Sequence, residues 1–195
     1  MIPVFADRDS FDDEAFADLD LSRADISNRE FLRCTFTNVQ LPDADLSGAR
    51  FDDCLFNGCD LSRARATNVA ARGVAFVRCR LMGVDFSELR PTPCLAFEHC
   101  TLQYATFGPA NLTATRFVSC KLVEVNFFAT RLAEADFTDS DLTGARFEGC
   151  DVRSAQFAGT RGFYIDPAKN VVSGAQINVE TAVTIATAFG FKTDI

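Results

Sequence analysis

The chain has 195 residues, 48% hydrophobic and 24% charged, a composition that suits one globular domain with a substantial core. Its net charge of −8 and pI near 4.6 argue against direct nucleic-acid binding through neutralised phosphates. No apolar run approaches the roughly 20 residues that cross a bilayer, so we expect no membrane insertion. The first residues lack the basic start and long apolar run of a signal peptide, which predicts a cytoplasmic protein.

From residue 11 onward, a large apolar residue occupies every fifth position. This series of central positions runs from Phe11 to Phe86 and resumes one residue late, from Phe97 to Phe157. Of its 29 positions, only Ala66 and Ala71 are not Phe, Leu, Ile or Val. A period of five fits neither an α-helix nor a flat strand. It predicts a chain that turns a corner after every five residues and points one large side chain inward from each side.

Residue type also repeats at every fourth central position, which predicts coils of four sides. One column of central positions consists of Phe16, Phe36, Phe56, Phe76, Phe97, Phe117, Phe137 and Phe157. In stacked coils, each Phe would pack on the Phe of the next coil. We therefore predict an all-β fold, a right-handed quadrilateral β-helix over residues 1–162. At the usual strand spacing, roughly seven to eight coils would form a rod on the order of 35 Å long.

Two residues before each central position the sequence prefers a small residue, expected to fill a corner of the square section. Most of the cysteines occupy this position: Cys34, Cys54, Cys59, Cys79, Cys100, Cys120 and Cys150. There they act as small hydrophobic residues, so the sequence predicts no metal site and no cofactor. Cys94 lies outside the register and is a candidate reactive thiol, and His99, the sole histidine, falls at an outward position. Without a phosphate loop, a serine elbow or an isolated carboxylate pair, we predict no enzyme activity.

The phase of the repeat slips by one residue within segment 87–96, which contains Arg90, Pro91, Thr92 and Pro93. The two prolines remove backbone donors and favour a protruding turn. One interpretation is a harmless one-residue bulge. The other is a loop that contacts a partner, in which case these four residues bind it.

Residues 163–195 depart from the repeat and predict a C-terminal cap with a short helix. Asn178 is a favourable N-cap and Gly190 a favourable helix end. An apolar stripe between them, expected to cover the last coil, consists of Val179, Ala182, Val183, Ala186 and Phe189. The remaining apolar residues suit a twofold dimer interface, with a capped monomer as the alternative. The candidate dimerisation residues are Val183, Ile185, Phe189 and Phe191.

Acidic residues are concentrated between residues 134 and 151, where Arg146 is the only basic residue. An acidic surface either keeps a protein soluble or meets a basic partner such as a DNA-binding groove, and composition does not choose between them. The candidate partner-binding residues of this segment are Glu134, Asp136, Asp139, Asp141 and Asp151.

The repeat, with motifs such as Ala44-Asp45-Leu46-Ser47-Gly48, is similar to that of pentapeptide repeat proteins over about residues 10–160. The tail, with Tyr164-Ile165-Asp166-Pro167 and a helix ending in Phe189-Gly190-Phe191, resembles the Qnr, MfpA and AlbG group of topoisomerase-protecting proteins. Many Qnr proteins carry two loops, whereas only segment 87–96 breaks the phase here.

This resemblance implies a homodimeric rod that binds DNA gyrase, and sometimes topoisomerase IV, as a partial mimic of DNA. It further implies protection of the enzyme from quinolones or peptide poisons, as acquired resistance or as self-immunity of a producer. The alternative is a pentapeptide repeat scaffold with a different protein partner.

Overall fold

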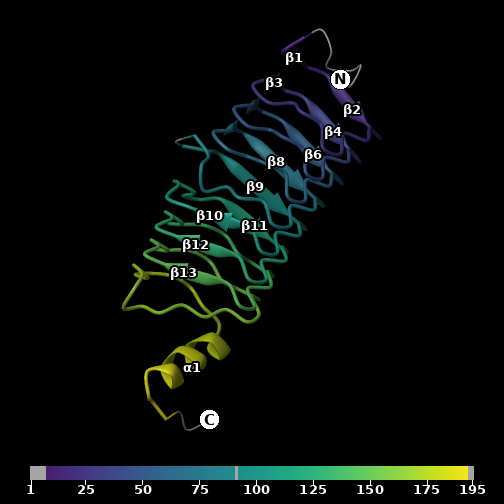
Figure 1. The fold of residues 1–195 in the computed structure, drawn as a ribbon. Coiled ribbons are helices and arrows are strands. Elements are labelled where there is room, and N and C mark those ends of the chain that lie inside the picture. Colours follow the sequence, from purple (N-terminus) through teal and green to yellow (C-terminus); the bar gives the residue numbers. More distant parts are fainter. Residues whose placement is uncertain (1–7, 91, 193–195) are drawn as a thin grey trace.

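A computed structural model describes residues 8–90 and 92–192 and shows a β-solenoid of about seven coils with one short helix, α1, at its C-terminal end (Figure 1). The predicted β-helix with a terminal helix is confirmed. The strands of the described residues are β1 (Ser10–Asp12), β2 (Ala15–Ala17), β3 (Glu30–Leu32), β4 (Thr35–Thr37), β5 (Arg50–Asp52), β6 (Leu55–Asn57), β7 (Ala70–Arg72), β8 (Val74–Val77), β9 (Leu95–Glu98), β10 (Thr106–Phe107), β11 (Arg116–Val118), β12 (Asn126–Phe128) and β13 (Arg146–Glu148). Helix α1 spans Val179–Ala188.

The strands stack in parallel on the sides of the rod, which we number in chain order. Face 1 holds the sheet β1-β3-β5-β7, and face 2 holds the sheet β2-β4-β6-β8-β9-β11. Face 3 is joined by single bridges such as Asp20↔Gln40 and Asp141↔Arg161. Face 4 begins with bridges such as Asp25↔Asp45 and continues as the sheet β10-β12-β13.

Partners in neighbouring coils keep a constant separation along the sequence, except across one coil. Phe36 pairs with Phe56, but Phe76 pairs with Phe97, so this step contains one extra residue. Arg90 still keeps the regular register. Its N–H donates to the carbonyl of Val69, and in the preceding coil the N–H of Ala70 donates to the carbonyl of Ala49 in the same way. Since Leu95 already pairs with Val74 in the shifted register, the extra residue lies between Arg90 and Leu95.

The core consists of columns of stacked rings. Phe rings on face 2 follow one another at 4.5–5.2 Å between centroids from Phe16 to Phe157. A second column, Phe11-Phe31-Phe51, lies on face 1 before the phase slip. From Phe86 onward the second column lies on face 4 and consists of Phe86, Phe107, Phe127 and Phe147. The second aromatic column therefore changes face halfway along the rod.

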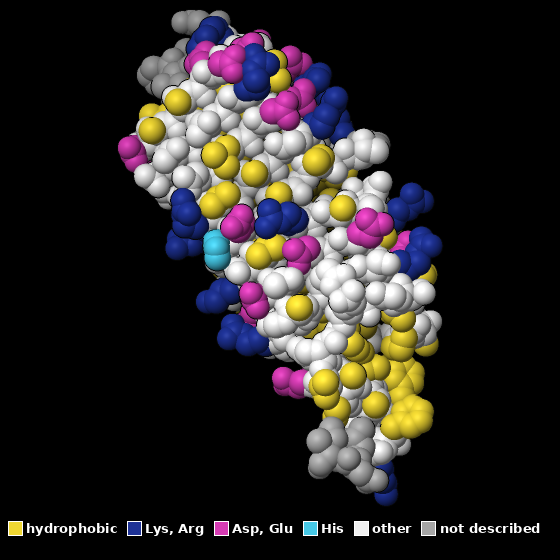
Figure 2. All heavy atoms as spheres, turned by 180° about the vertical axis from the view of Figure 1, so that it is seen from behind, with side chains coloured by type: hydrophobic (Ala, Val, Ile, Leu, Met, Phe, Trp, Pro, Cys, Tyr) yellow, Lys and Arg dark blue, Asp and Glu magenta, His cyan; other side chains and the backbone are white. Residues whose placement is uncertain are grey.

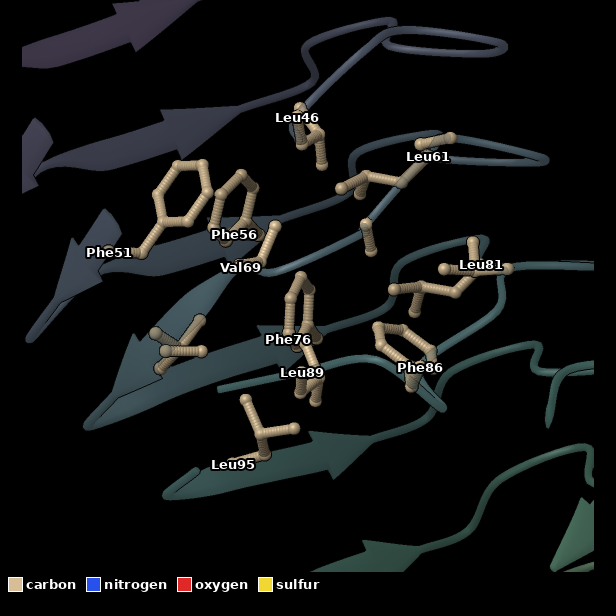
Figure 3. Close-up of a pocket in the computed structure, with 15 residues that line it drawn as sticks. Leu46, Phe51, Phe56, Leu61, Val69, Phe76, Leu81, Phe86, Leu89 and Leu95 are labelled. Atoms are coloured by element: carbon tan, nitrogen blue, oxygen red, sulfur yellow. The ribbon is translucent and has the colours of Figure 1, made fainter. Parts of the chain in front are cut away.

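The change of face leaves a small cavity of about 30 Å³ inside the rod (Figure 3). On face 1, Ala71 pairs with Phe51 and ends the ring column. On face 4, Ala66 precedes the first ring, Phe86, by one coil. Leu89 and Leu95 point into this space from segment 87–96 (Figure 3). Ala66 and Ala71, the two exceptions in the series of central positions, thus lie where the second ring column moves from face 1 to face 4.

Aspartates before the central positions explain part of the alternation between strand and turn. At Asp85 and Asp136 the side chain accepts the N–H of the residue two positions on, at 2.8 and 3.0 Å. This local bond competes with an extended ladder. Phe86 and Phe137 therefore lie outside strands, between a single bridge and a turn, whereas most other central Phe residues lie in strands.

Candidate interaction surfaces

The acidic residues between 134 and 151 do not form one patch, because each step of five residues moves the chain to the next face. Asp136 continues the column of Arg116 on face 2, and Asp139 lies at the corner that follows it. Asp141 lies on face 3 between Lys121 and Arg161. Asp151 lies on face 1. Glu134 is near it, because the Glu134 N–H donates to the carbonyl of Arg153 in the next coil.

Two of these five carboxylates are paired with arginines. Arg153 contacts Asp151 at 2.6 Å, and this hydrogen bond lowers the pKa of Asp151. Arg161 contacts Asp141 at 3.0 Å. Burial opposes ionisation of Asp141, but hydrogen bonds from Thr143 and the Arg161 charge outweigh it and lower its pKa. Glu134 and Asp139 are the exposed carboxylates of this set, and they lie at the corners before and after face 2.

Segment 87–96 projects from the side of the rod between β8 and β9 (Figure 1). Arg90 and Thr92 are exposed, whereas Pro93 is buried against the rod. Arg90 Nε donates to Asn68 Oδ1 at 3.3 Å, which positions its guanidinium beside face 1. Of the four residues expected to bind a partner, Pro91 lies outside the described residues.

Helix α1 is tied to the last coil by its N-cap. Asn178 Oδ1 accepts the Thr181 N–H at 2.8 Å, and Asn178 Nδ2 donates to the Thr160 carbonyl at 3.1 Å. The predicted N-cap is therefore confirmed. The backbone ladder continues past residue 162, because Asp151 pairs with Val171 and Gln156 with Gln176. Much of the segment expected as an irregular cap is thus a further coil.

The helix turns a different face to the rod than its apolar stripe predicted. Thr181 is buried and Ile185 packs against the core, whereas Val179 remains 76% exposed. The stripe was expected to lie on the rod, but the N-cap bonds of Asn178 rotate the helix so that positions 181 and 185 do. Of the four candidate dimerisation residues, Val183 and Ile185 are half-buried, and Phe189 and Phe191 are 48% and 68% exposed.

Apolar surface is concentrated at this end of the molecule. Figure 2 shows hydrophobic side chains gathered around the C-terminal end of the rod. A hollow of about 220 Å³ lies between the last coil and the helix. Its apolar lining includes Phe157, Phe163, Ile165, Val172, Ile177 and Ile185.

The cysteines in the corner positions do more than fill space. Cys54 Sγ, for example, donates to the carbonyls of Phe31 and Asp52, each at 3.4 Å. Thr130 and Ser140 replace cysteine at equivalent corners and make the same kind of bond. Burial raises the pKa of Cys54 to about 11, so this thiol stays protonated. At these corners a small side chain also donates a hydrogen bond, whereas other corners hold Ala or Val, as at Ala44 and Val39. The preference for small residues did not reveal this second role.

His99 is exposed, as expected, and Cys94 is exposed as well. His99 Nε2 lies 3.9 Å from a Glu98 carboxylate oxygen. Within residues 8–90 and 92–192, no three His, Cys, Asp or Glu side chains are placed to hold a metal ion. In the same part of the chain, no helix is long and apolar enough to span a membrane.

Sequence profiles of the family agree with this architecture. The profile "Pentapeptide repeats (8 copies)" matches residues 20–58, and "Pentapeptide repeat region" matches residues 94–161, together more than half of the chain. The chain belongs to the pentapeptide repeat family. A comparison with curated protein sequences gives no match.

Solved pentapeptide repeat structures are similar to this one at low sequence identity. A trypsin-treated QnrB1, described as a plasmid-mediated fluoroquinolone resistance protein, is 18% identical with a TM-score of 0.53, over 95% of this chain and 100% of that one. HetL, involved in heterocyst differentiation regulation in the cyanobacterium Nostoc sp. strain PCC 7120, is 18% identical with a TM-score of 0.48, over 86% of each chain. A thylakoid lumen protein of Arabidopsis thaliana is 14% identical with a TM-score of 0.22, over 92% of this chain and 77% of that one. At these identities the likeness shows the fold alone.

Proposed function

We propose that this pentapeptide repeat protein is a homodimer that binds DNA gyrase, or topoisomerase IV, and protects it from quinolones or peptide poisons. The observation that carries the proposal is the C-terminal end, where an Asn178-capped helix closes the last coil and leaves Phe189 and Phe191 exposed. This end matches the tail by which the sequence resembles the topoisomerase-protecting group. The structural likeness to QnrB1, a fluoroquinolone resistance protein, supports it at the level of the fold.

The exposed rings favour pairing of two copies through the C-terminal end. Isolated exposed Phe residues are common, but here they follow a helix whose Ile185 lines an apolar hollow at the tip of the rod. A twofold interface would bury the same surface on both copies. In analytical ultracentrifugation, the native protein should sediment at twice the 21.4 kDa mass of one chain, and Phe189→Asp with Phe191→Asp should sediment as a monomer. A monomeric native protein would refute the dimer.

Mimicry of DNA in this proposal depends on shape and local charge. Duplex DNA carries one charge per about 1.7 Å, so a rod of about 35 Å would need roughly 20 charges to match it. The chain carries a net charge of −8. Because Asp141 and Asp151 are paired with arginines, the exposed Glu134 and Asp139, at the corners on either side of face 2, are the clearest candidates to meet a basic surface.

A matched pair of charge reversals tests this assignment. Asp18 and Asp139 occupy the same corner after face 2, both with positive φ, but near opposite ends of the rod. Lysine should therefore strain the backbone equally at both positions. We expect Asp139→Lys to weaken gyrase binding, measured by surface plasmon resonance, at least several-fold more than Asp18→Lys. Equal losses would show that the C-terminal acidic residues have no special role.

The function itself is tested with purified gyrase in a supercoiling assay. The protein is titrated against a quinolone, and separately against a peptide poison such as albicidin. Rescue of supercoiling in either arm supports protection and identifies the class of poison. Inhibition without rescue would make the protein a regulator of gyrase. No effect in either arm would favour the second candidate, a scaffold for another protein partner.

A further inference from the structure

A polar hollow of about 580 Å³ lies on face 1 beside segment 87–96. Its walls carry the side chains of Arg50, Arg72 and Arg90, and its floor is formed by Ala70 and Ala71. The volume is in the range of small-ligand sites, but the lining is charged rather than apolar. On a chain with a net charge of −8, three arginines around one hollow require an explanation.

The register of the coils explains how the hollow forms. Arg50 pairs with Ala70, and Arg90 follows Ala70 one coil later in the same outward column. Ala70 is thus the one short side chain between two long ones. The extra residue of segment 87–96 lies just after Arg90, so the segment bulges where β7 would otherwise pair with a following strand. A missing side chain and a bulged neighbour together open the hollow.

The charges in the hollow do not cancel. Among the described residues that line it, Asp52 is the only carboxylate. Arg50 contacts it at 2.7 Å, whereas Arg72 lies 3.8 Å from it and keeps 73% of its side chain exposed. Glu30 precedes Arg50 in its column, outside the lining. Three guanidinium groups against one carboxylate leave a formal charge of +2 within the lining.

We propose that this hollow binds carboxylate side chains of an acidic protein segment. A guanidinium pairs with a planar carboxylate through two parallel hydrogen bonds. Arg50 and Arg90 lie one coil on either side of Ala70, and Arg72 lies two residues along the same strand β7 on the same outward side, so neighbouring acidic side chains of an extended segment each meet an arginine. A nucleic-acid strand is disfavoured, because its continuous phosphate charge would meet the repulsion of the whole acidic chain. The site does not depend on topoisomerase being the partner.

Fluorescence anisotropy with a labelled octapeptide of alternating Glu and Ser tests the proposal. We expect salt-sensitive binding to the native protein, at least tenfold weaker binding to Arg72→Gln with Arg90→Gln, and no binding of the same peptide with Gln in place of Glu. Ala70→Gln should also abolish binding, because it fills the hollow without changing the charge. Asp52→Asn should strengthen binding several-fold, because it removes the competing carboxylate; a merely destabilised protein would not show this gain.

Matched controls separate the site from bulk charge. Arg116→Gln with Arg146→Gln removes the same charge from exposed positions on faces 2 and 4 and should leave binding unchanged. A loss equal to that of the Arg72 and Arg90 variant would refute the site, and so would an absence of peptide binding. Inorganic phosphate and a single-stranded 12-mer DNA are added as competitors. If either displaces the peptide from Arg72 and Arg90 at lower concentration, the hollow is a phosphate site and the carboxylate assignment is wrong.

Discussion

Two regions of the rod fill their interior with different sets of side chains. From Phe97 to Phe157, opposite faces 2 and 4 carry rings and the faces between them carry smaller aliphatic side chains, with side chains such as Phe127 and Leu142 fully buried. In residues 66–96, about one and a half coils that we call the transition coil, Ala66 and Ala71 replace rings or leucines, and a cavity of about 30 Å³ remains. The same coil carries the extra residue and the arginine hollow. The comparison shows that the coil with an internal cavity is also one whose outer surface departs from the repeat.

The largest expected effect comes from removing a ring in the regular region. Phe127 and Phe128 are neighbours in β12, the first fully buried and the second 39% exposed. Phe127→Ala should lower the free energy of unfolding by about 3–5 kcal/mol, because it removes a stacked ring and leaves a cavity. Phe128→Ala should cost less than about 1 kcal/mol. Urea unfolding followed by circular dichroism measures both changes. Similar losses of stability in the two variants would contradict the assignment of Phe127 to the buried ring column.

A matched leucine truncation then compares the two regions directly. Leu142 is fully buried among regular coils, whereas Leu89 is half-buried and borders the existing cavity. We expect Leu142→Ala to cost about 3–5 kcal/mol and Leu89→Ala only about 1–2 kcal/mol, since less apolar surface is lost. The midpoint of urea unfolding again provides the measurement. If Leu89→Ala were the more costly change, the transition coil would be a rigid part of the core rather than a poorly packed one.

Filling the cavity should raise the free energy of unfolding rather than lower it. Ala71→Val adds volume next to about 30 Å³ of empty space, and a gain of about 0.7 kcal/mol follows from the usual cost of cavity volume. The control is Ala135→Val, at a fully buried corner of a regular coil, which should destabilise by about 1–3 kcal/mol through overpacking. Destabilisation of both variants by the same amount would show that the transition coil has no usable space.

The comparison of regions also explains what could be predicted from the sequence. The five-residue period dictates which side chains point inward, so the series from Phe11 to Phe157 predicted the fold. The series also located the transition coil, through Ala66, Ala71 and the phase slip. It did not predict that the second aromatic column changes face, although Phe51 and Phe86 lie on different faces in the register of four central positions per coil.

The surfaces were harder to predict for a geometric reason. Residues close in sequence, such as Asp136 and Asp141, lie on different faces, whereas spatial neighbours such as Arg50 and Ala70 belong to successive coils. An acidic stretch in the sequence is therefore not an acidic patch on the rod. The orientation of α1 depended on hydrogen bonds of Asn178 to Thr181 and Thr160, which hydrophobic periodicity does not contain.

The smallest expected effect concerns ion pairs between coils before the transition. Arg33 holds Asp13 at 2.7 Å and Arg63 holds Asp43 at 2.8 Å, and each pair joins two successive coils. These hydrogen bonds lower the pKa of both carboxylates below their ordinary value of 3.8. A lowered pKa in the folded state stabilises the fold above pH 3.8, and this stabilisation is lost as the pH falls through the folded-state pKa.

Arg63→Met should therefore remove part of the acid sensitivity of the rod. At neutral pH the variant should be only slightly less stable than the native protein, because the exposed ion pair is screened by salt and contributes little. The difference in stability should vanish as the pH falls below 3.8 and Asp43 becomes protonated. Because each coil contacts only its neighbours, amide exchange followed by mass spectrometry should be faster mainly around residues 40–65 and unchanged beyond Phe97. A uniform increase along the chain would instead mean that the transition coil does not separate the two regions, and that the rod opens as one cooperative unit.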